Sequence, residues 1–188
     1  NDTPKSPSDF RGAFLFMQDP NELFDIVDAH DRAIGRATRR YVHARRLCHR
    51  AVHILIFNSA GRLFVQKRAA TKDTFPGCYD SSASGHLNSG EDYDAGAVRE
   101  LREELGLEIP RRHLRRLFQL AASAETGWEL IWVYSAHGNN RPQPNPDEIE
   151  SGQFLTRATV ETLDPCAPAF HRIVCELRAR GLFPLPSQ

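Results

Sequence analysis

The most constraining feature of the chain is a cluster of three glutamates, Glu100, Glu103 and Glu104, just before Gly106. Their spacing of three and four residues places all three carboxylates on one face of a helix. Like charges at this spacing repel by roughly a few tenths of a kcal/mol per pair, so the cluster destabilises a helix unless a cation lies between the carboxylates. Oxygen ligands grouped in this way suit a hard divalent ion such as Mg²⁺ or Mn²⁺.

The glutamates belong to a predicted helix over residues 92–105. Ala95, Val98, Leu101 and Leu105 give this helix an apolar stripe and leave the glutamates on another face. The glycine that follows is expected to end the helix, because glycine readily adopts the left-handed conformation found at helix C-termini.

The rest of the chain alternates between predicted strands and helices, which is typical of an α/β fold. The continuous apolar run 51–57 predicts a strand buried on both faces, and residues 62–68 return as a second strand after a turn. Residues 69–79, 85–91 and 138–147 are expected to be loops. Further strands are expected at 23–27, 33–37, 114–124, 128–137 and 152–155, and further helices at 38–45, 156–164 and 168–180.

Composition narrows the possible environments and partners. The 188 residues suffice for one domain, which we expect at 21–188 after a loose tail at 1–20. The formal net charge of zero argues against a nucleic acid polymer as partner. Apolar runs fall short of the roughly 20 residues that a membrane span needs, so we expect no membrane partner. The four cysteines lack a metal-binding spacing, which favours free thiols in a reducing cytoplasm.

Residues 85–107 also match a known motif at every defined position. The Nudix box consists here of Gly85, Glu91, Arg99, Glu100, Leu101, Glu103, Glu104, Gly106 and Leu107. The chain therefore resembles the Nudix family, most of whose members hydrolyse diphosphates linked to another group. The resemblance implies an α/β/α sandwich with a mixed β-sheet, Mg²⁺ or Mn²⁺ as cofactor and a small-molecule diphosphate as substrate. Many Nudix proteins are dimers, so a homodimer is an alternative to a monomer.

The resemblance assigns roles within the box. Glu100 and Glu104 are expected to be the principal metal ligands, and Glu103 is expected to be the third ligand or to bind the metal through water. The resemblance implies that one of these glutamates, or an acid on a nearby loop, is the general base; Glu100 is placed first, and Glu103 is the other candidate on the helix. Arg99 lies one helical turn from Glu103 and is expected to orient it rather than to touch substrate.

Other positions of the motif region are expected to support the site. Gly85 is expected to permit a tight turn, and Glu91 to hold the loop against the helix. Asp147, Glu148 and Glu150 lie in a segment where related proteins sometimes complete the metal site or supply the base. Ordinary solvated loop acids are the alternative for these three.

Outside the box, the chain resembles isopentenyl diphosphate isomerases and the isomerase-like Nudix hydrolases. The resemblance runs from about residue 24 to 163 and rests on residues 48–51, 63–68, 71–72 and 76–77. The isomerases bind the substrate diphosphate with an arginine and a lysine that fall on Arg68 and Lys72. We therefore expect a cationic clamp at these residues, with ordinary surface charge as the alternative.

One replacement in this region favours hydrolysis over isomerisation. Ser84 stands where the isomerases have a catalytic cysteine, and a hydroxyl replaces a thiol poorly in acid–base chemistry because its pKa is much higher. The isomerases also lack two of the three helical glutamates, whereas this chain keeps all of them.

Several isomerase metal ligands are only partly matched. His49, His86 and Glu129 fall on such positions, but a further isomerase glutamate falls on Gly127, and the earliest histidine falls one position from His43. The sequence thus predicts an incomplete second metal site, with His86 as a loop histidine that holds no metal.

The remaining conspicuous side chains have structural interpretations. His53 lies inside the apolar run and is expected to be a hydrogen-bonded core residue. Trp128, Trp132 and Tyr134 alternate with smaller residues, which favours packing of a strand against the core over stacking on a base.

Together these features predict a divalent-metal-dependent Nudix hydrolase that cleaves a diphosphate linkage of a nucleoside di- or triphosphate or a related small diphosphate. Two alternatives remain. The first is an isopentenyl diphosphate isomerase, and the second is a non-catalytic Nudix module that binds a nucleotide.

Overall fold

Strand β3 (His49–Phe57) is the centre of the fold, and Arg50 is its one residue that is not fully buried. Along its whole length β3 pairs in parallel with β8 (Glu129–His137), and its opposite edge pairs antiparallel with β6 (Ala83–His86). A strand flanked on both edges and covered on both faces carries apolar side chains in both directions, as the 51–57 run does.

The computed structural model describes residues 19–138 and 141–184, and the other strands extend the sheet from β3. β1 (Leu23–Val27) and β2 (Ala33–Thr38) form a hairpin beside the start of β3. β4 (Leu63–Arg68) pairs with β5 (Tyr79–Asp80) and β9 (Ile149–Leu155), and β7 (Arg115–Leu120) pairs with β8. The β3–β8 pair is parallel and the others are antiparallel, so the sheet is mixed.

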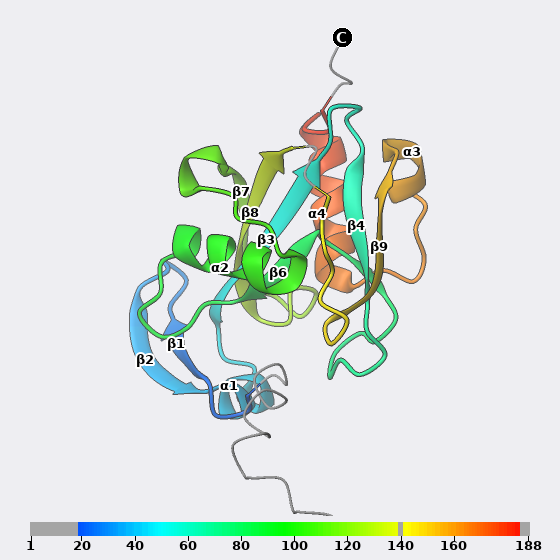
Figure 1. Ribbon diagram of the computed structural model, residues 1–188. Coiled ribbons are helices and arrows are strands. Elements are labelled where there is room, and N and C mark those ends of the chain that lie inside the picture. Colours follow the sequence, from blue (N-terminus) through cyan, green and yellow to red (C-terminus); the bar gives the residue numbers. More distant parts are fainter. Residues whose placement is uncertain (1–18, 139–140, 185–188) are drawn as a thin grey trace, which may run out of the picture.

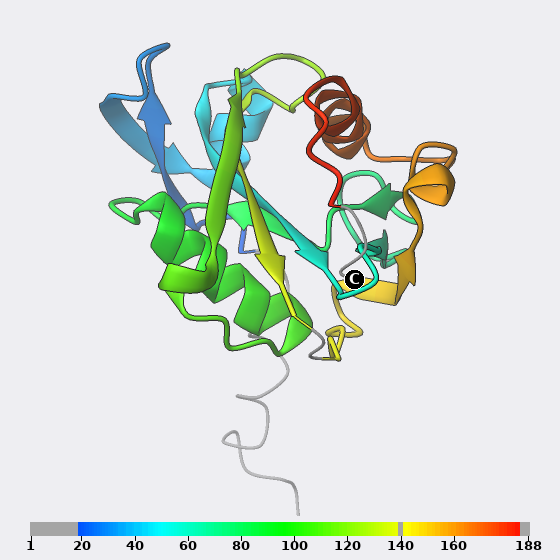
Figure 2. The ribbon, with the colours of Figure 1, turned by 90° about the horizontal axis from the view of Figure 1, so that it is seen from above.

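Helices cover both faces of this sheet. Figures 1 and 2 show α2 (Tyr93–Leu105) on one face and α4 (Pro168–Ala179) on the other. The shorter helices are α1 (Arg39–Arg45), the 3₁₀ helix η2 (Arg111–His113) and α3 (Arg157–Val160). The predicted α/β/α sandwich with a mixed β-sheet is confirmed.

Two hydrophobic cores lie on opposite sides of β3. Its even-numbered residues from Val52 to Ile56 pack with Leu101 of α2, and its odd-numbered residues Ala51, Leu55 and Phe57 pack with Phe170 of α4. Alternate side chains of a strand point to opposite faces, so one strand supports both cores. Leu101 and Phe170 are fully buried, which contributes about 2–3 kcal/mol each.

Helix α2 begins and ends as its sequence predicts. The Asp92 side chain accepts a hydrogen bond from Ala95 N at 2.9 Å, which caps the first turn. Gly106 adopts the left-handed conformation with φ 62°, and its N–H donates to Arg102 O. Both ends of the helix that carries the glutamates are therefore fixed.

The rotation of α2 differs from the prediction. Ala95 is exposed, whereas Tyr93, Ala97, Leu101 and Leu105 form the buried stripe. The stripe lies next to Glu100 and Glu104, which are buried as well, so the predicted separation of an apolar face from a glutamate face was wrong. The helix turns two of its carboxylates toward the sheet.

Element boundaries differ elsewhere because pairing extends or shortens strands. Residues 85 and 86 belong to β6 and not to a loop, since they pair with Val52 and Ala51 of β3. β9 begins at Ile149, three residues earlier than predicted, and β7 ends at Leu120. Of the tail predicted at residues 1–20, residues 1–18 lie outside the described residues. Among the described residues, we find no helix that is long and apolar enough to cross a membrane.

Gly152 of β9 provides a test of the packing between β4 and β9. A Cβ at this position would lie 2.3 Å from the ring of Phe64, which is 4% exposed and cannot move freely. We expect Gly152→Ala to lower the free energy of unfolding by about 1–3 kcal/mol, measured by urea denaturation.

Gly35 of the β1–β2 hairpin is the matched control. A Cβ there would meet only Ile26 Cδ1, at an ordinary distance of 3.8 Å. Gly35→Ala should change stability by no more than about 0.5 kcal/mol. Equal effects of the two substitutions would contradict the packing described here.

Candidate active site

The glutamates of α2 line one pocket with residues from distant parts of the chain. This acidic pocket has a volume of about 390 Å³, and its wall includes Glu22, Arg39, Lys72, Glu100, Glu103, Glu104 and Glu148. Glu100 and Glu104 are 8% and 6% exposed, whereas the Glu103 side chain is 44% exposed. The structure thus brings the three predicted metal ligands together, with Glu103 at the rim.

Arg99 holds these carboxylates in place. It donates to Glu100 Oε1 at 2.7 Å and to Glu103 Oε2 at 3.0 Å. It also donates to both oxygens of Glu91 at 2.9 Å and to His86 O at 2.8 Å. The prediction that Arg99 orients Glu103 is confirmed, and the same guanidinium also fixes Glu100 and the loop.

Glu91 connects the loop to the helix, as expected. Its Oε2 accepts from Asn88 N at 2.9 Å in addition to Arg99. Burial by itself lowers the pKa of Arg99, but the hydrogen bonds that Arg99 donates to Glu91 and Glu100, and the charges of these two carboxylates, raise the pKa by more, so the guanidinium stays charged.

Glu104 is held by two neutral donors. Its Oε2 accepts from Gln66 Nε2 and from Ser84 N, both at 3.1 Å. Burial raises the pKa of Glu100 and of Glu104, and Glu104 raises that of Glu100 further. Carboxylates with raised pKa values on one face fit a hard cation, because a bound cation would stabilise their charged forms.

Position 85 requires glycine because the Glu100 carboxylate lies very close to its backbone, and not because the chain turns there. Gly85 lies in β6, and a Cβ on it would fall 2.0 Å from Glu100 Oε1. The φ angle of Gly85 is not positive. The expected tight turn was therefore wrong: the missing side chain makes room for the Glu100 carboxylate against the strand.

Arg68 and Lys72 lie near each other beside the acidic pocket. Both line an adjoining pocket of about 130 Å³, which shares Lys72 and Ser84 with the acidic pocket. Arg68 donates to Asp80 Oδ2 at 2.9 Å and to Thr74 O at 3.1 Å, so it has partners within the wall. Lys72 contacts Glu148.

The three loop acids have different surroundings. Glu148 lines the acidic pocket and contacts Lys72. Glu150 pairs with Lys67 at 2.8 Å on the exposed side of β4, and Asp147 is exposed. Of the three candidates, Glu148 alone is among the lining residues of the acidic pocket.

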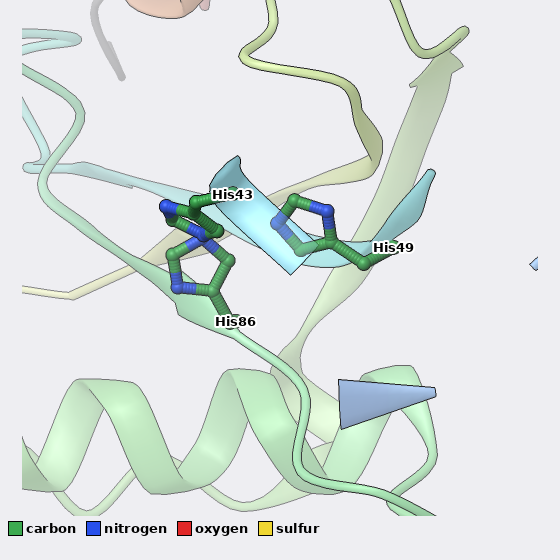
Figure 3. A group of neighbouring side chains, drawn as sticks. All are labelled: His43, His49 and His86. Carbon is green, nitrogen blue, oxygen red and sulfur yellow. The ribbon is translucent and has the colours of Figure 1, made fainter. Parts of the chain in front are cut away.

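Three histidines converge beside this pocket. The candidate ligand nitrogens of His43, His49 and His86 all lie within 4.8 Å of one another, and Figure 3 shows the three rings gathered together. Burial lowers the pKa of His43 and of His49 to about 4, so both rings are neutral at pH 7. Neutral imidazole is the form that binds metals such as Zn²⁺.

The hydrogen bonds of the histidine cluster define which nitrogens are available. Nε2 of His43 and of His49 are buried with no hydrogen-bond partner among the described residues. Arg39 lies 2.8 Å from His86 Nδ1, which must therefore accept, and His86 Nε2 lies 2.9 Å from Glu129 Oε1. The unpartnered Nε2 atoms of His43 and His49 are thus free to hold a metal, whereas His86 Nε2 carries the ring hydrogen and donates to Glu129. His86 lies in β6 beside the other two histidines, so the expected loop position was wrong.

A model of the NUDIX domain matches residues 48–176 of the chain. The chain belongs to the Nudix family.

Curated Nudix relatives agree with this assignment. The chain is 37% identical over 147 residues to an uncharacterized Nudix hydrolase of Streptomyces coelicolor, covering 77% of this chain and 80% of that protein. It is 30% identical over 164 residues to isopentenyl-diphosphate Delta-isomerase 2 of Photorhabdus laumondii subsp. laumondii, covering 86% and 93%. The predicted resemblance to the isomerase-like Nudix subgroup is confirmed, as is the predicted class of hydrolase acting on acid anhydrides.

A solved structure shows the same Nudix arrangement. The crystal structure of a protein from Deinococcus radiodurans matches this chain with a TM-score of 0.73 and 29% identity, covering 82% of this chain and 98% of the other.

Arg39 is a pocket residue that the sequence analysis missed. It opens α1, is 7% exposed, and lines both the acidic and the adjoining pocket. No motif marks it, because the Nudix box begins 46 residues later at Gly85 and arginine is common throughout this chain.

The prediction for His53 is confirmed, and the prediction for Trp128 is wrong. His53 is buried and its Nδ1 lies 2.8 Å from Ser81 Oγ, so the predicted hydrogen-bonded core histidine is confirmed. Trp128 was expected in the core with Tyr134, which is 1% exposed, but Trp128 precedes the strand with φ 67° and is 37% exposed.

The raised pKa values predict how the metal-free Nudix protein responds to pH. Burial raises the pKa of Glu104 from 4.5 to about 7, so its contribution to stability is present below pH 4.5 and is lost as the pH rises through 7. Between pH 5 and 8 in EDTA, we expect the Tm of wild type to fall by at least about 3 °C more than that of Glu104→Gln. Saturating Mg²⁺ should remove most of this difference. Identical Tm profiles of the two proteins in EDTA would contradict it.

Proposed function

We propose that this protein is a Mg²⁺- or Mn²⁺-dependent hydrolase that cleaves a diphosphate linkage of a nucleoside di- or triphosphate or of a related small diphosphate. The observation that supports it most is the burial of Glu100 and Glu104 in one pocket with Glu103 at its rim. Together with Glu148 these carboxylates supply only oxygen ligands, which is the donor set that Mg²⁺ and Mn²⁺ prefer.

A bound ion supplies charge neutralisation for the phosphates and lowers the pKa of a coordinated water. The chain's own residues do the rest. Glu100 and Glu103 are our candidates for accepting the proton of the attacking water, since both carboxylates are oriented by Arg99. Arg39 and Lys72 line both pockets and are our candidates for binding phosphate oxygens. Arg68 is proposed to complete the clamp and to keep its bond to Asp80.

Hydrolysis of a panel of substrates, measured by chromatography of the phosphomonoester, pyrophosphate and phosphate products, tests this proposal. The panel holds nucleoside di- and triphosphates, dinucleotides, sugar nucleotides and isoprenoid diphosphates, each with Mg²⁺ and with Mn²⁺. We expect hydrolysis of one class, and we expect Glu104→Gln to reduce its kcat by about 100-fold or more, because the pocket loses a charged ligand.

Glu108→Gln is the matched control, since Glu108 is an exposed glutamate just beyond the same helix. It should leave the rate unchanged. Tight nucleotide binding by wild type without turnover of any substrate would instead support the non-catalytic binding module.

Isomerisation is the second candidate function, and the convergence of His43, His49 and His86 favours it. Ser84 and Gly127 oppose it, because a thiol and a carboxylate of the isomerases are missing at these positions. We expect wild type to form no dimethylallyl diphosphate from isopentenyl diphosphate, measured by chromatography of the products. Substantial interconversion would overturn the hydrolase proposal.

A further inference from the structure

Lys72 is in an unusual position for a phosphate-binding residue, because it already has an acidic partner. Its ammonium contacts Glu148 Oε2, and the two side chains are only 8% and 16% exposed. Lys72 lines both the acidic pocket and the adjoining pocket. The ammonium therefore lies among the carboxylates that the proposed ion would use.

Glu104 belongs to the same charge cluster. Burial is the main reason why the pKa of Glu104 is raised; the charge of Lys72 lowers this pKa, and the charge of Glu148 raises it. Glu104, Glu148 and Lys72 all line the acidic pocket, and the ion pair within it joins Lys72 to Glu148. The positive charge of Lys72 therefore offsets part of the repulsion between the two carboxylates.

The backbone holds the acids in place and leaves the lysine side chain adjustable. Glu148 O accepts from Ala69 N at 3.0 Å, and Asn145 N donates to Glu104 O at 2.8 Å, which ties the loop to both sides of the pocket. Lysine carries its charge on a flexible four-carbon stem with rotatable donors. A change of partner is therefore easier for Lys72 than for either acid.

We propose that Lys72 and a divalent ion are alternative partners of Glu148, so that ion binding at Glu148 and Glu104 releases Lys72 to bind a substrate phosphate. This inference rests on the proposed function, since the ion is the one that hydrolysis would use. An ammonium and a divalent cation repel strongly at the short distances within this pocket. The released ammonium has three donors for phosphate oxygens, so ion and diphosphate bind cooperatively.

Calorimetric titration separates this role from a structural one. Mn²⁺ is titrated into wild type and Lys72→Met, and imidodiphosphate, a diphosphate that resists hydrolysis, is titrated into the Mn²⁺-loaded proteins. We expect Lys72→Met to bind Mn²⁺ about tenfold more tightly, because a competing charge is gone. It should bind imidodiphosphate about tenfold more weakly. A merely structural defect would weaken both.

Two further lysine variants act as controls. Lys67→Met removes the exposed partner of Glu150 at 2.8 Å, on the strand that precedes the Lys72 loop, and should change neither affinity. Lys72→Arg keeps the charge and should bind Mn²⁺ within about twofold of wild type. Lys72→Gln is measured in parallel in case Lys72→Met does not fold, and the same direction is expected. Unchanged or weaker Mn²⁺ binding in the folded neutral variants overturns the inference.

Glu104→Gln distinguishes a failure of this inference from a failure of the proposed function. If Mn²⁺ binding is as strong in Glu104→Gln as in wild type, the metal site of the proposed function is wrong and this inference is overturned with it. If Glu104→Gln loses Mn²⁺ binding but the neutral variants of Lys72 match wild type, only the role of Lys72 is overturned.

Discussion

Two carboxylates, those of Glu100 and Glu104, lie buried within a single turn of helix α2. Burying unpaired charges costs several kcal/mol, so their surroundings must compensate. Arg99 supplies a permanent charge to Glu100, and Ser84 N and Gln66 supply neutral donors to Glu104. The need to compensate these two buried carboxylates explains much of the local sequence around the Nudix box. A bound divalent ion would supply compensation that these donors leave incomplete.

Much of the fold could be predicted because local patterns coincide with the elements they form. The apolar run of β3, the hairpin at its start and the cap-and-glycine pattern of α2 each depend on residues close together in sequence. The rotation of α2 could not be predicted from hydropathy, since a pattern search assigns glutamates to the solvent side. Here two of them face the sheet, and Ala95 is exposed instead.

The candidate site was only partly predictable, for a related reason. The Nudix box identified the glutamates and Arg99, which share one helix. His43, His49 and His86 come from α1, β3 and β6, and their convergence depends on how the chain reverses after α1. Arg46 adopts the left-handed conformation at that point, with φ 53°. The mismatch of one position at His43 in a linear comparison therefore does not prevent this side chain from lying beside His49 and His86.

The loop before β9 has a consequence for how such proteins diverge. Backbone hydrogen bonds from Gln143 and Asn145 to the last carbonyls of α2, and from Ala69 to Glu148, fasten this segment on both sides. They also satisfy carbonyl groups that a helix end otherwise leaves to water. The chain can therefore vary in length before Gln143 during evolution while the carboxylates of α2 keep their positions.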